Sequence, residues 1–542
     1  MKKTFFTSGT PFIWLTGLAA ALGLLMIVGL LLLILVNGLG IFWPQNLQQF
    51  TLKDGSVVLG EVWEKETHDN YDTGREETRY RIKTANRDFY GLDFRWLKED
   101  DISERQMPPT AWVLERQAWG QFFGFIIRLS NNGVALASDE LNVAAQLPEW
   151  HEKMLAAADE IHQLEKGSIG SISMQIENMR LEKRKVILRR DTTTASGRAA
   201  LRRVDEELAS LERQYQELEK ELMQRITDSR AITITLRTID GQEKELPLID
   251  VVRMWQPNRM SAPEKAGLYA ARVWEFLSGE PREANMEGGV FPAIFGTVLM
   301  VILMSIAAVP IGVLTAVYLR EYAKQGPVVR AVRIAVNNMA GVPSIVYGIF
   351  GLGFFVYTVG GTIDQLFYSE ALPSPTFGTG GILWASLTLA LLTLPVVVVA
   401  TEEGLAAVPR SIRDGSLALG ATKFETLWRI ILPSTSPAIL TGTILAIARA
   451  AGEVAPLMVT GVVKLAPSLP LDSTFPYLHL ERKFMHLGFH IYDVGFQSPN
   501  VEAALPIVYA TTLLLVLIIL TLNLTAILLR NRLYARFSVT KI

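Results

Sequence analysis

The chain has 542 residues, of which 49% are hydrophobic, and its formal net charge is −2. This near-neutral balance argues against nucleic acid as a partner. The absence of cysteine excludes disulfides, thiolate metal sites and cysteine nucleophiles. Apolar residues are concentrated in 12–36 and 289–530, whereas most of the charge lies in 44–286, which indicates a membrane protein with a large polar insertion.

The first predicted element is a membrane span. Residues 12–36 form an apolar run that is longer than a signal-peptide core and has no convincing cleavage site. Lys2 and Lys3 precede it, and a positive flank places the N-terminus in the cytoplasm. Residues 1–43 are therefore expected to be a cytoplasmic start and an uncleaved span, and residues 44–286 to lie outside, in the periplasm.

Both ends of the insertion carry strand signals. Apolar and polar residues alternate from Phe50 to Trp63 around the turn Asp54-Gly55, which predicts a β-hairpin. A similar pattern returns at 232–241 and 246–255. We expect one small β domain with an inserted helical part. The apolar segment 119–129 is too short to span a membrane and is expected in the core or at the lipid interface.

The middle of the insertion is predicted to be helical. Apolar residues recur at alternating intervals of three and four, at Leu201, Val204, Leu208, Leu211, Tyr215, Leu218 and Leu222. That spacing is the seam of a coiled coil. Ile172, Ile176, Met179 and Val186 indicate a second helix, with the turn at 191–197. We expect an antiparallel helical hairpin over about 155–226, with pairing between two chains as the alternative.

Residues 287–542 form the predicted membrane core. Five further spans are expected, at 290–319, 334–359, 381–401, 436–462 and 503–529. Basic residues fill the loop at 320–333, the loop at 402–434 and the tail, whereas 360–380 contains neither Lys nor Arg. The positive-inside rule therefore places both termini in the cytoplasm. Breakers at 310–312, 341–343, 395 and 456 suit a bundle that moves around a pathway.

The loop 402–434 is the most informative stretch of the core. It begins with Glu402 and Glu403 at the end of an apolar run and continues to Asp414. Apolar residues then recur at helical spacing at Ala421, Phe424, Leu427, Trp428 and Ile431, which predicts one apolar face on a short helix. Gly420 is expected to turn the chain before this helix and Pro433 to stop it. The face could pack on its own membrane domain, lie in the lipid interface, or dock in a groove of a partner protein.

Ionisable residues inside an apolar span are costly and mark candidate functional positions. Arg449 and Glu453 stand four residues apart in the predicted fifth span, where they would share a helix face. They could form a structural ion pair. Alternatively, the Arg449 guanidinium could line the path of an oxyanion, with Glu453 holding that guanidinium in place.

Other chemical signals are weak. The chain has no phosphate-binding loop of the Gly-x-x-x-x-Gly-Lys-Ser/Thr type, so we expect no ATPase activity and no cofactor in it. His486 and His490 are four residues apart, but no carboxylate is convincingly placed beside them. We expect no metal site there and interpret 475–496 as a folded-back aromatic segment at the interface.

The loop resembles the cytoplasmic loop of permease subunits in ATP-binding-cassette importers. That signature reads E-A-A, three residues, Gly, nine residues, then I-x-L-P. Gly420, Ile430, Leu432 and Pro433 match it in spacing, whereas Asp414-Gly415-Ser416 replaces the opening triplet. Segments 288–297, 342–351, 401–403 and 447–453 resemble the PstA permeases of phosphate importers, and the insertion resembles their long forms in Gram-negative bacteria.

This resemblance implies a mainly α polytopic protein of the inner membrane, with six transmembrane helices of the type I importer (MetI-like) fold and an α+β extramembrane domain. It also implies partners: a second permease (PstC-like), an ATPase dimer (PstB-like) that binds ATP and Mg, and a periplasmic phosphate-binding protein (PstS-like). The complex would lie in the lipid bilayer. The residues that would contact the ATPase are Asp414, Gly420, Phe424, Trp428, Ile430, Leu432 and Pro433.

Several alternatives remain open at this point. The chain could carry another oxyanion or be the PstC-type partner subunit. An ion-coupled secondary transporter would need no ATPase, and a membrane-anchored coiled-coil scaffold would need no pathway. The signature loop argues against the last two classes.

Overall fold

The computed structural model describes residues 10–70, 75–189, 194–498 and 500–537. Lys2, Lys3 and residues 191–193 of the predicted turn at 191–197 lie outside these ranges. Within the described residues, six helical runs are long and apolar enough to cross a membrane, as predicted. They are Pro11–Gly40, Phe291–Tyr322, Ser344–Phe367, Ile382–Ala407, Lys423–Gly452 and Val501–Arg532. The chain is therefore a mainly helical, polytopic membrane protein with an additional α+β part.

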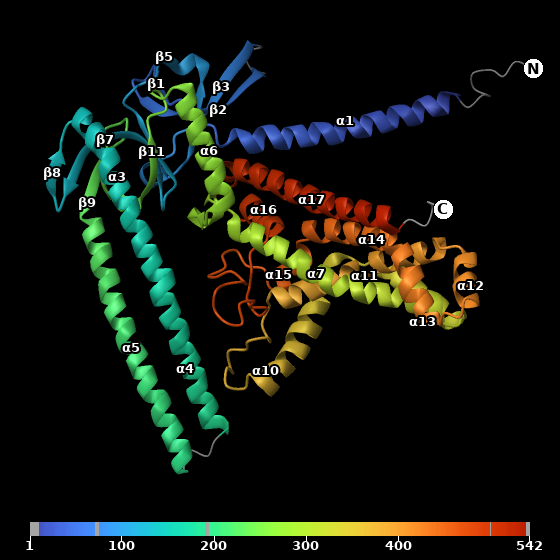
Figure 1. Ribbon diagram of the computed structural model, residues 1–542. Coiled ribbons are helices and arrows are strands. Elements are labelled where there is room, and N and C mark those ends of the chain that lie inside the picture. The colour runs from blue at the N-terminus through green and yellow to red at the C-terminus, as the bar shows by residue number, and fades with distance from the viewer. Residues whose placement is uncertain (1–9, 71–74, 190–193, 499, 538–542) are drawn as a thin grey trace, which may run out of the picture.

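The helices of the bundle and its loops run together in one half of the molecule (Figure 1). They are α1 (Thr10–Gly40), α7 (Phe291–Val317), η5 (Tyr318–Tyr322), α8 (Pro327–Met339), α9 (Ser344–Phe350), η6 (Gly351–Gly360), α10 (Gly361–Phe367), α11 (Ile382–Ala407), α12 (Arg410–Ala418), α13 (Lys423–Thr426), η7 (Leu427–Ile431), α14 (Leu432–Gly452), α15 (Ala455–Thr460), α16 (Leu487–Phe496) and α17 (Val501–Phe537).

Helix α11 is the centre of the bundle, because 67% of its apolar window is buried whereas no other span exceeds 33%. It packs between α7 and α14. Glycines allow this close approach: a methyl group at Gly312 of α7 would lie 2.7 Å from Val397, and one at Gly442 of α14 would lie 2.7 Å from Ala400. Small residues at contacts are what helix pairs in lipid require, because lipid gives no hydrophobic drive to association.

Two predicted spans have different bounds in the structure. The span predicted at 334–359 begins instead at Ser344, because the break before Pro343 separates it from α8. Helix α8 carries Arg330 and Arg333 on a largely exposed surface, and such charges are costly in hydrocarbon. The span predicted at 436–462 ends at Gly452, followed by the short helix α15 and by Gly461 at φ +151°.

The strands of the insertion form two antiparallel sheets, and residues of both sheets share one hydrophobic cluster. One has the order β4-β3-β2-β1-β5, and the other β10-β9-β7-β6-β11 with β8 beside β7. The strands are β1 (Gln48–Leu52), β2 (Val57–Asn70), β3 (Arg75–Lys83), β4 (Phe94–Lys98), β5 (Ile102–Gln106), β6 (Trp112–Arg116), β7 (Gln121–Asn131), β8 (Val134–Ala137), β9 (Ile232–Arg237), β10 (Glu243–Pro247) and β11 (Val251–Trp255), with the short pair β12 (Pro281–Arg282) and β13 (Glu287–Gly288) before α7.

The predicted hairpin at the start of the insertion is confirmed. Strands β1 and β2 pair around Gly55, which has φ +83°, and the Asp54 carboxylate accepts a bond of 2.8 Å from the Ser56 amide. Segment 119–129 contributes most of β7, the central strand of the second sheet, and Phe122 and Phe123 are fully buried there. It is therefore core, one of the two outcomes expected.

Short helices complete the insertion: α2 (Arg87–Tyr90), η1 (Glu99–Asp101), η3 (Leu248–Asp250), α6 (Ala262–Ser278) and η4 (Glu283–Asn285). Between β8 and β9 the chain runs through α3 (Glu140–His162), η2 (Gln163–Ile169), α4 (Gly170–Arg189) and α5 (Ala195–Arg230). These helices extend beyond the 155–226 expected.

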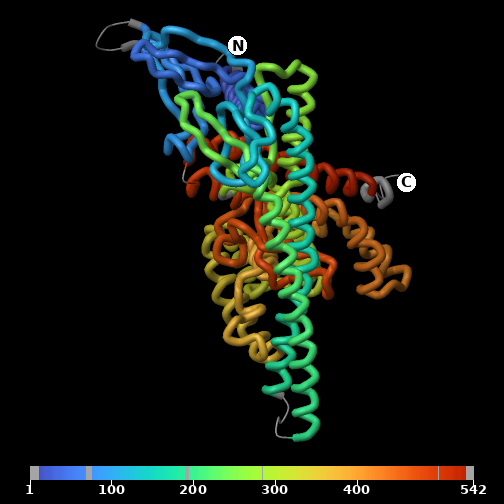
Figure 2. The backbone as a smooth tube through the Cα atoms, turned by 90° about the vertical axis from the view of Figure 1, so that its left-hand side faces the viewer, coloured from blue at the N-terminus to red at the C-terminus, as the bar shows by residue number. Residues whose placement is uncertain are grey.

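Helices α4 and α5 lie side by side within the one chain. Ion pairs join them at Arg180–Glu212, 3.3 Å, and Lys183–Asp205, 2.8 Å. Of the predicted seam on α5, only Val204 is fully buried, and its other members are half-buried. A coiled-coil twist of this pair stays a prediction. Figures 1 and 2 show the pair as a long arm that crosses the end of the bundle nearest the sheets.

Candidate functional site

The loop between α11 and α14 forms a compact turn at the end of the bundle opposite the sheets (Figure 1). Gly420 has φ +86°, a left-handed conformation that favours glycine and that reverses the chain between α12 and α13, as predicted. Thr422 and Glu425 form a reciprocal capping box at the start of α13. The hydroxyls of Ser416 and Thr426, 2.9 Å apart and buried, join the two arms of the turn.

The predicted single apolar face of the second arm is wrong, because the structure divides it between two surfaces. Leu427 and Ile431 are buried against the end of the bundle, in a cluster with Leu405. Phe424 and Trp428 point away from the bundle, each 64% exposed, with their rings stacked at 6.3 Å and 9°. The helix therefore has one anchoring face and one outward face.

The other arm of the turn also carries exposed apolar side chains. Leu417 is 47% exposed and Leu419 is 91% exposed. We call Leu417, Leu419, Phe424 and Trp428 the tip surface. Several large exposed apolar side chains on one short turn are typical of an interaction site.

Two partly buried ion pairs lie where the turn meets the bundle, one on the turn itself and one between α8 and α11. Arg413 contacts Glu321 at 3.0 Å and donates a bond of 2.6 Å to the Leu405 carbonyl. Arg333 of α8 contacts Glu402 at 3.1 Å. Sequence reasoning missed Glu321 and treated both arginines only as markers of orientation, because pairs so distant in sequence leave no local signal.

The remaining predicted loop residues lie in different settings. Asp414 and Glu403 are exposed, and no ion pair or hydrogen bond from either side chain is seen within the described residues. Ile430 and Leu432 are half-buried.

The prediction that Pro433 stops the helix is wrong. The run from Lys423 to Gly452 is continuous, and Pro433 lies in the first turn of α14. The preceding turn, η7, is π-helical. Because a proline lacks an amide proton and crowds the carbonyl four residues earlier, a locally widened turn is the way a helix continues through it.

Arg449 and Glu453 are in contact but not on one helix face. Arg449 is in the last turn of α14, whereas Glu453 follows the helix end in an extended conformation, with N–O separation 3.6 Å. Their side chains are 32% and 21% exposed, so neither is sealed in the core. A cation in the last helical turn is also favoured by the helix dipole.

Two segments distant in sequence meet at this pair. A methyl group at Gly348 of α9 would lie 2.7 Å from the Cα of Pro456 in α15, so these helices touch through backbone. Tyr347, beside Gly348, is buried and donates a bond of 2.6 Å to the Met339 carbonyl. The segments 342–351 and 447–456 thus build one region around Arg449.

His486 and His490 are buried rather than interfacial. Burial lowers the pKa of His486 to about 3 and that of His490 to about 4, so both rings are neutral. The neighbouring Asp493 is already bonded to Lys464 at 3.1 Å and to Asn285 at 3.2 Å. Among the residues that the structure describes, no group of three or more His, Cys, Asp or Glu could hold a metal.

The class of protein follows from the bundle and its sequence. Residues 308–539 match the family model described as binding-protein-dependent transport system inner membrane component. The chain is thus a permease component of an ABC importer, a class in which the ATPase is a separate chain.

Relatives narrow this class further. The phosphate transport system permease protein PstA of Mycobacterium leprae is 39% identical over 196 residues, 36% of this chain and 59% of the relative. PstA 1 of Mycobacterium tuberculosis (strain CDC 1551 / Oshkosh) is 36% identical over 243 residues, 45% of this chain and 71% of the relative. The chain belongs to the family of PstA phosphate transport system permeases.

Solved structures give a weaker likeness. An inward-facing form of the MetNI methionine ABC transporter is 15% identical, with TM-score 0.34, covering 51% of this chain and 99% of that chain. This superposition is too loose to carry a fold assignment, so the permease fold rests on the family match.

Proposed function

We propose that this chain forms half of the translocation pathway of an ATP-driven phosphate importer and receives its ATPase on the tip surface. The tip surface is the single observation that carries this proposal. Its four large apolar residues are exposed on a turn that the Arg413–Glu321 ion pair fixes to the bundle. A stacked Phe424–Trp428 pair is the kind of aromatic anchor that fills a groove of a partner.

Motion of the ATPase has a direct route into the bundle. The second arm of the turn is continuous with α14, and the first arm is joined to it through Ser416 and Thr426. Arg413 connects the turn to the end of α7, and Arg333 connects α8 to α11. A displacement of the tip surface would therefore move several spans together. Glu402 and Glu403 stand at the entry to the loop.

The family to which the chain belongs supports the proposed partners. A PstB-like ATPase dimer would bind ATP and Mg, a PstC-like permease would supply the other half of the pathway, and a PstS-like protein would deliver phosphate. Within the pathway, Arg449 is the proposed contact for the oxyanion, held in place by Glu453 and supported by α9 and α15.

Uptake by proteoliposomes that hold the whole complex tests this function. Phosphate should accumulate only with ATP, and excess sulfate or molybdate should compete poorly. Uptake without an ATPase would indicate a secondary transporter, and preferential competition by another oxyanion would reassign the substrate.

The proposed topology has 1–43 and 287–542 as membrane parts, with cytoplasmic termini, the coupling loop 402–434 in the cytoplasm, and 44–286 in the periplasm. It is supported by the position of the sheets and of α12 and α13 at opposite ends of the bundle (Figure 1).

Thiol labelling tests the topology. The chain has no cysteine, so the protein without an introduced cysteine gives no labelling of its own. Glu219 on α5 and Lys324 before α8 are both exposed. In intact spheroplasts, an impermeant maleimide should label the Glu219→Cys variant and leave Lys324→Cys unlabelled until lysis. The reverse pattern would invert the whole arrangement.

A further inference from the structure

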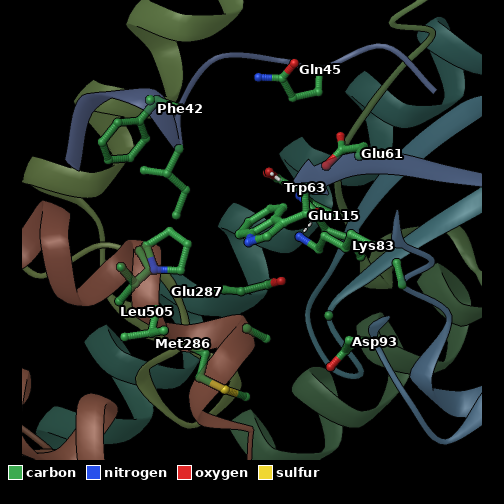
Figure 3. Close-up of a pocket in the computed structure, with 18 of the residues that line it drawn as sticks. Phe42, Gln45, Glu61, Trp63, Lys83, Asp93, Glu115, Met286, Glu287 and Leu505 are labelled. Atoms are coloured by element: carbon green, nitrogen blue, oxygen red, sulfur yellow. Dashed lines mark hydrogen bonds between the residues drawn. The ribbon is translucent and has the colours of Figure 1, made fainter. Parts of the chain in front are cut away.

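A cavity of about 640 Å³ lies where the insertion meets the membrane bundle. Its bundle side is formed by the end of α1 with the residues that follow it, including Phe42, and by the first turns of α17, including Leu505. Its other side is formed by strands β2 and β3, and Glu287 reaches into the space between (Figure 3). Both helices are candidate spans that end here, so in a membrane the cavity would lie near the level of the lipid headgroups.

Two carboxylates that face this cavity have no partner within the described residues. Glu61 of β2 is only 8% exposed, and no hydrogen bond or ion pair of its carboxylate is seen there. The Oε2 atom of Glu287 is buried without a hydrogen-bond partner. Lys83, the cation that acts on both, instead donates a bond of 2.8 Å to Gln121.

The other carboxylates that line the cavity each have a side-chain partner, which sets these two apart. Five are in ion pairs: Glu64–Arg81 at 3.4 Å, Glu115–Arg272 at 3.4 Å, Glu275–Arg282 at 2.8 Å, Glu502–Arg81 at 3.5 Å, and Glu283 with Arg87. The sixth, Asp93, accepts a bond of 2.6 Å from the Asn500 amide. A buried carboxylate without a partner is costly. Burial accordingly raises the pKa of Glu61, and it raises that of Glu287 to about 7.

Unpartnered donors line the same cavity. The Nε atoms of Arg81 and Arg282 are buried and have no hydrogen-bond acceptor within the described residues. The cavity therefore offers acceptors for a cation and, separately, donors for an anion, beside apolar walls. Its volume far exceeds that of a single ion, so a zwitterionic group fits the space and the charges.

We infer that this cavity binds a phosphoethanolamine group, with the primary ammonium at Glu61 and Glu287 and the phosphate at the two arginines. The group could come from phosphatidylethanolamine or from a soluble phosphoethanolamine ester. A primary ammonium donates N–H bonds to carboxylates, which a choline headgroup cannot do. This inference is independent of the transported substrate.

Thermal unfolding of the full-length protein in nanodiscs of stated lipid tests the inference. Phosphatidylethanolamine added to phosphatidylglycerol nanodiscs should raise the unfolding midpoint, and phosphatidylcholine should not. The double variant Glu61→Gln/Glu287→Gln should lose this response and at least roughly tenfold in retained phosphatidylethanolamine by native mass spectrometry. Glu152→Gln, which changes an exposed carboxylate on α3, is the matched control and should keep both.

The sources are separated in detergent. If glycerophosphoethanolamine stabilises the delipidated protein, a soluble ester is sufficient as the ligand. If only phosphatidylethanolamine stabilises it, the ligand is the lipid. An equal response to phosphatidylethanolamine and phosphatidylcholine, or an unchanged response in the double variant, would overturn the inference. Because glutamine removes a buried charge at nearly constant shape, loss of folding does not obscure the result.

A pH measurement gives an independent readout. Glu287 faces Glu115, Lys83, Arg282 and Glu283, and its pKa is about 7 against an ordinary 4.5. Since the folded state holds this proton more tightly than the unfolded state, the stabilisation is complete below pH 4.5 and is lost as pH rises through about 7. The delipidated protein should therefore lose thermal stability from pH 5 to 8 more steeply than Glu287→Gln. Parallel curves would contradict this assignment of the proton.

Discussion

The Trp428→Ala variant is expected to lose phosphate uptake and to release the ATPase during purification, while its spans still insert. Trp428 is exposed in this chain and stacks on Phe424, so truncation removes no core packing. An aromatic anchor at the centre of an interface typically contributes about 2 kcal/mol or more, which is roughly thirtyfold in affinity. ATPase co-purification and ATP-dependent uptake measure the two effects.

Trp274→Ala is the matched control. Trp274 is 69% exposed, close to the 64% of Trp428, but it lies on α6 of the insertion. Its removal should leave ATPase retention unchanged. Full retention and uptake in Trp428→Ala would remove the docking function of the tip surface.

A second change tests the turn rather than the anchor. Gly420→Pro forces φ to about −65° where the chain needs +86°, and it also removes the amide that donates 3.0 Å to the Leu417 carbonyl. The two arms of the turn should then be displaced and uptake lost with all four tip residues present. Normal phosphate uptake by Gly420→Pro would show that coupling to the ATPase does not depend on the geometry of this turn.

The Arg449→Gln variant is expected to assemble with its partners and to lose phosphate transport. An oxyanion crossing an apolar bundle needs compensating positive charge, and Arg449 is a partly exposed cation in the last turn of α14. Uptake should fall to background, while the amount of purified complex changes little.

Glu453→Gln distinguishes a path contact from a structural pair. A purely structural pair predicts that the two variants lose assembly to a similar extent, because each leaves one partner unpaired. A path contact predicts a much larger loss of transport in Arg449→Gln. The exchange Arg449→Glu/Glu453→Arg is a weaker test, since it places an anion at a helix C-terminus. A fully transporting Arg449→Gln complex would end the path hypothesis.

The turn around Gly420 shows how far local patterns reach. Its positive φ and its place between two short helices were predictable, because a glycine followed by a capping residue is a local signal. It was not predictable that the following helix has a buried face with Leu427 and an exposed face with Trp428. A periodic apolar pattern does not say which of its residues another part of the chain covers. Pro433 failed as a helix stop for a related reason, since the π-helical turn that accommodates it depends on the packing of the whole run.

The insertion shows the same limit at a larger scale. The strands beside the Asp54-Gly55 turn and those at 232–255 carry alternation and were found. Strands such as β3 and β4 are rich in charge, and their register depends on partners brought from elsewhere in the chain. Glu61 and Glu287, 226 positions apart in numbering, carry no sequence sign that both face one cavity.

The sequence by itself determined the six spans and the class of the loop 402–434, because hydrocarbon thickness and motif spacing are local constraints. Only the tertiary structure decided which apolar residues stay exposed at the tip, where Glu453 stands relative to the end of α14, and which carboxylates lie unpaired at the junction. Exposure and charge pairing are properties of neighbours in space, and a chain that folds back on itself chooses those neighbours through packing.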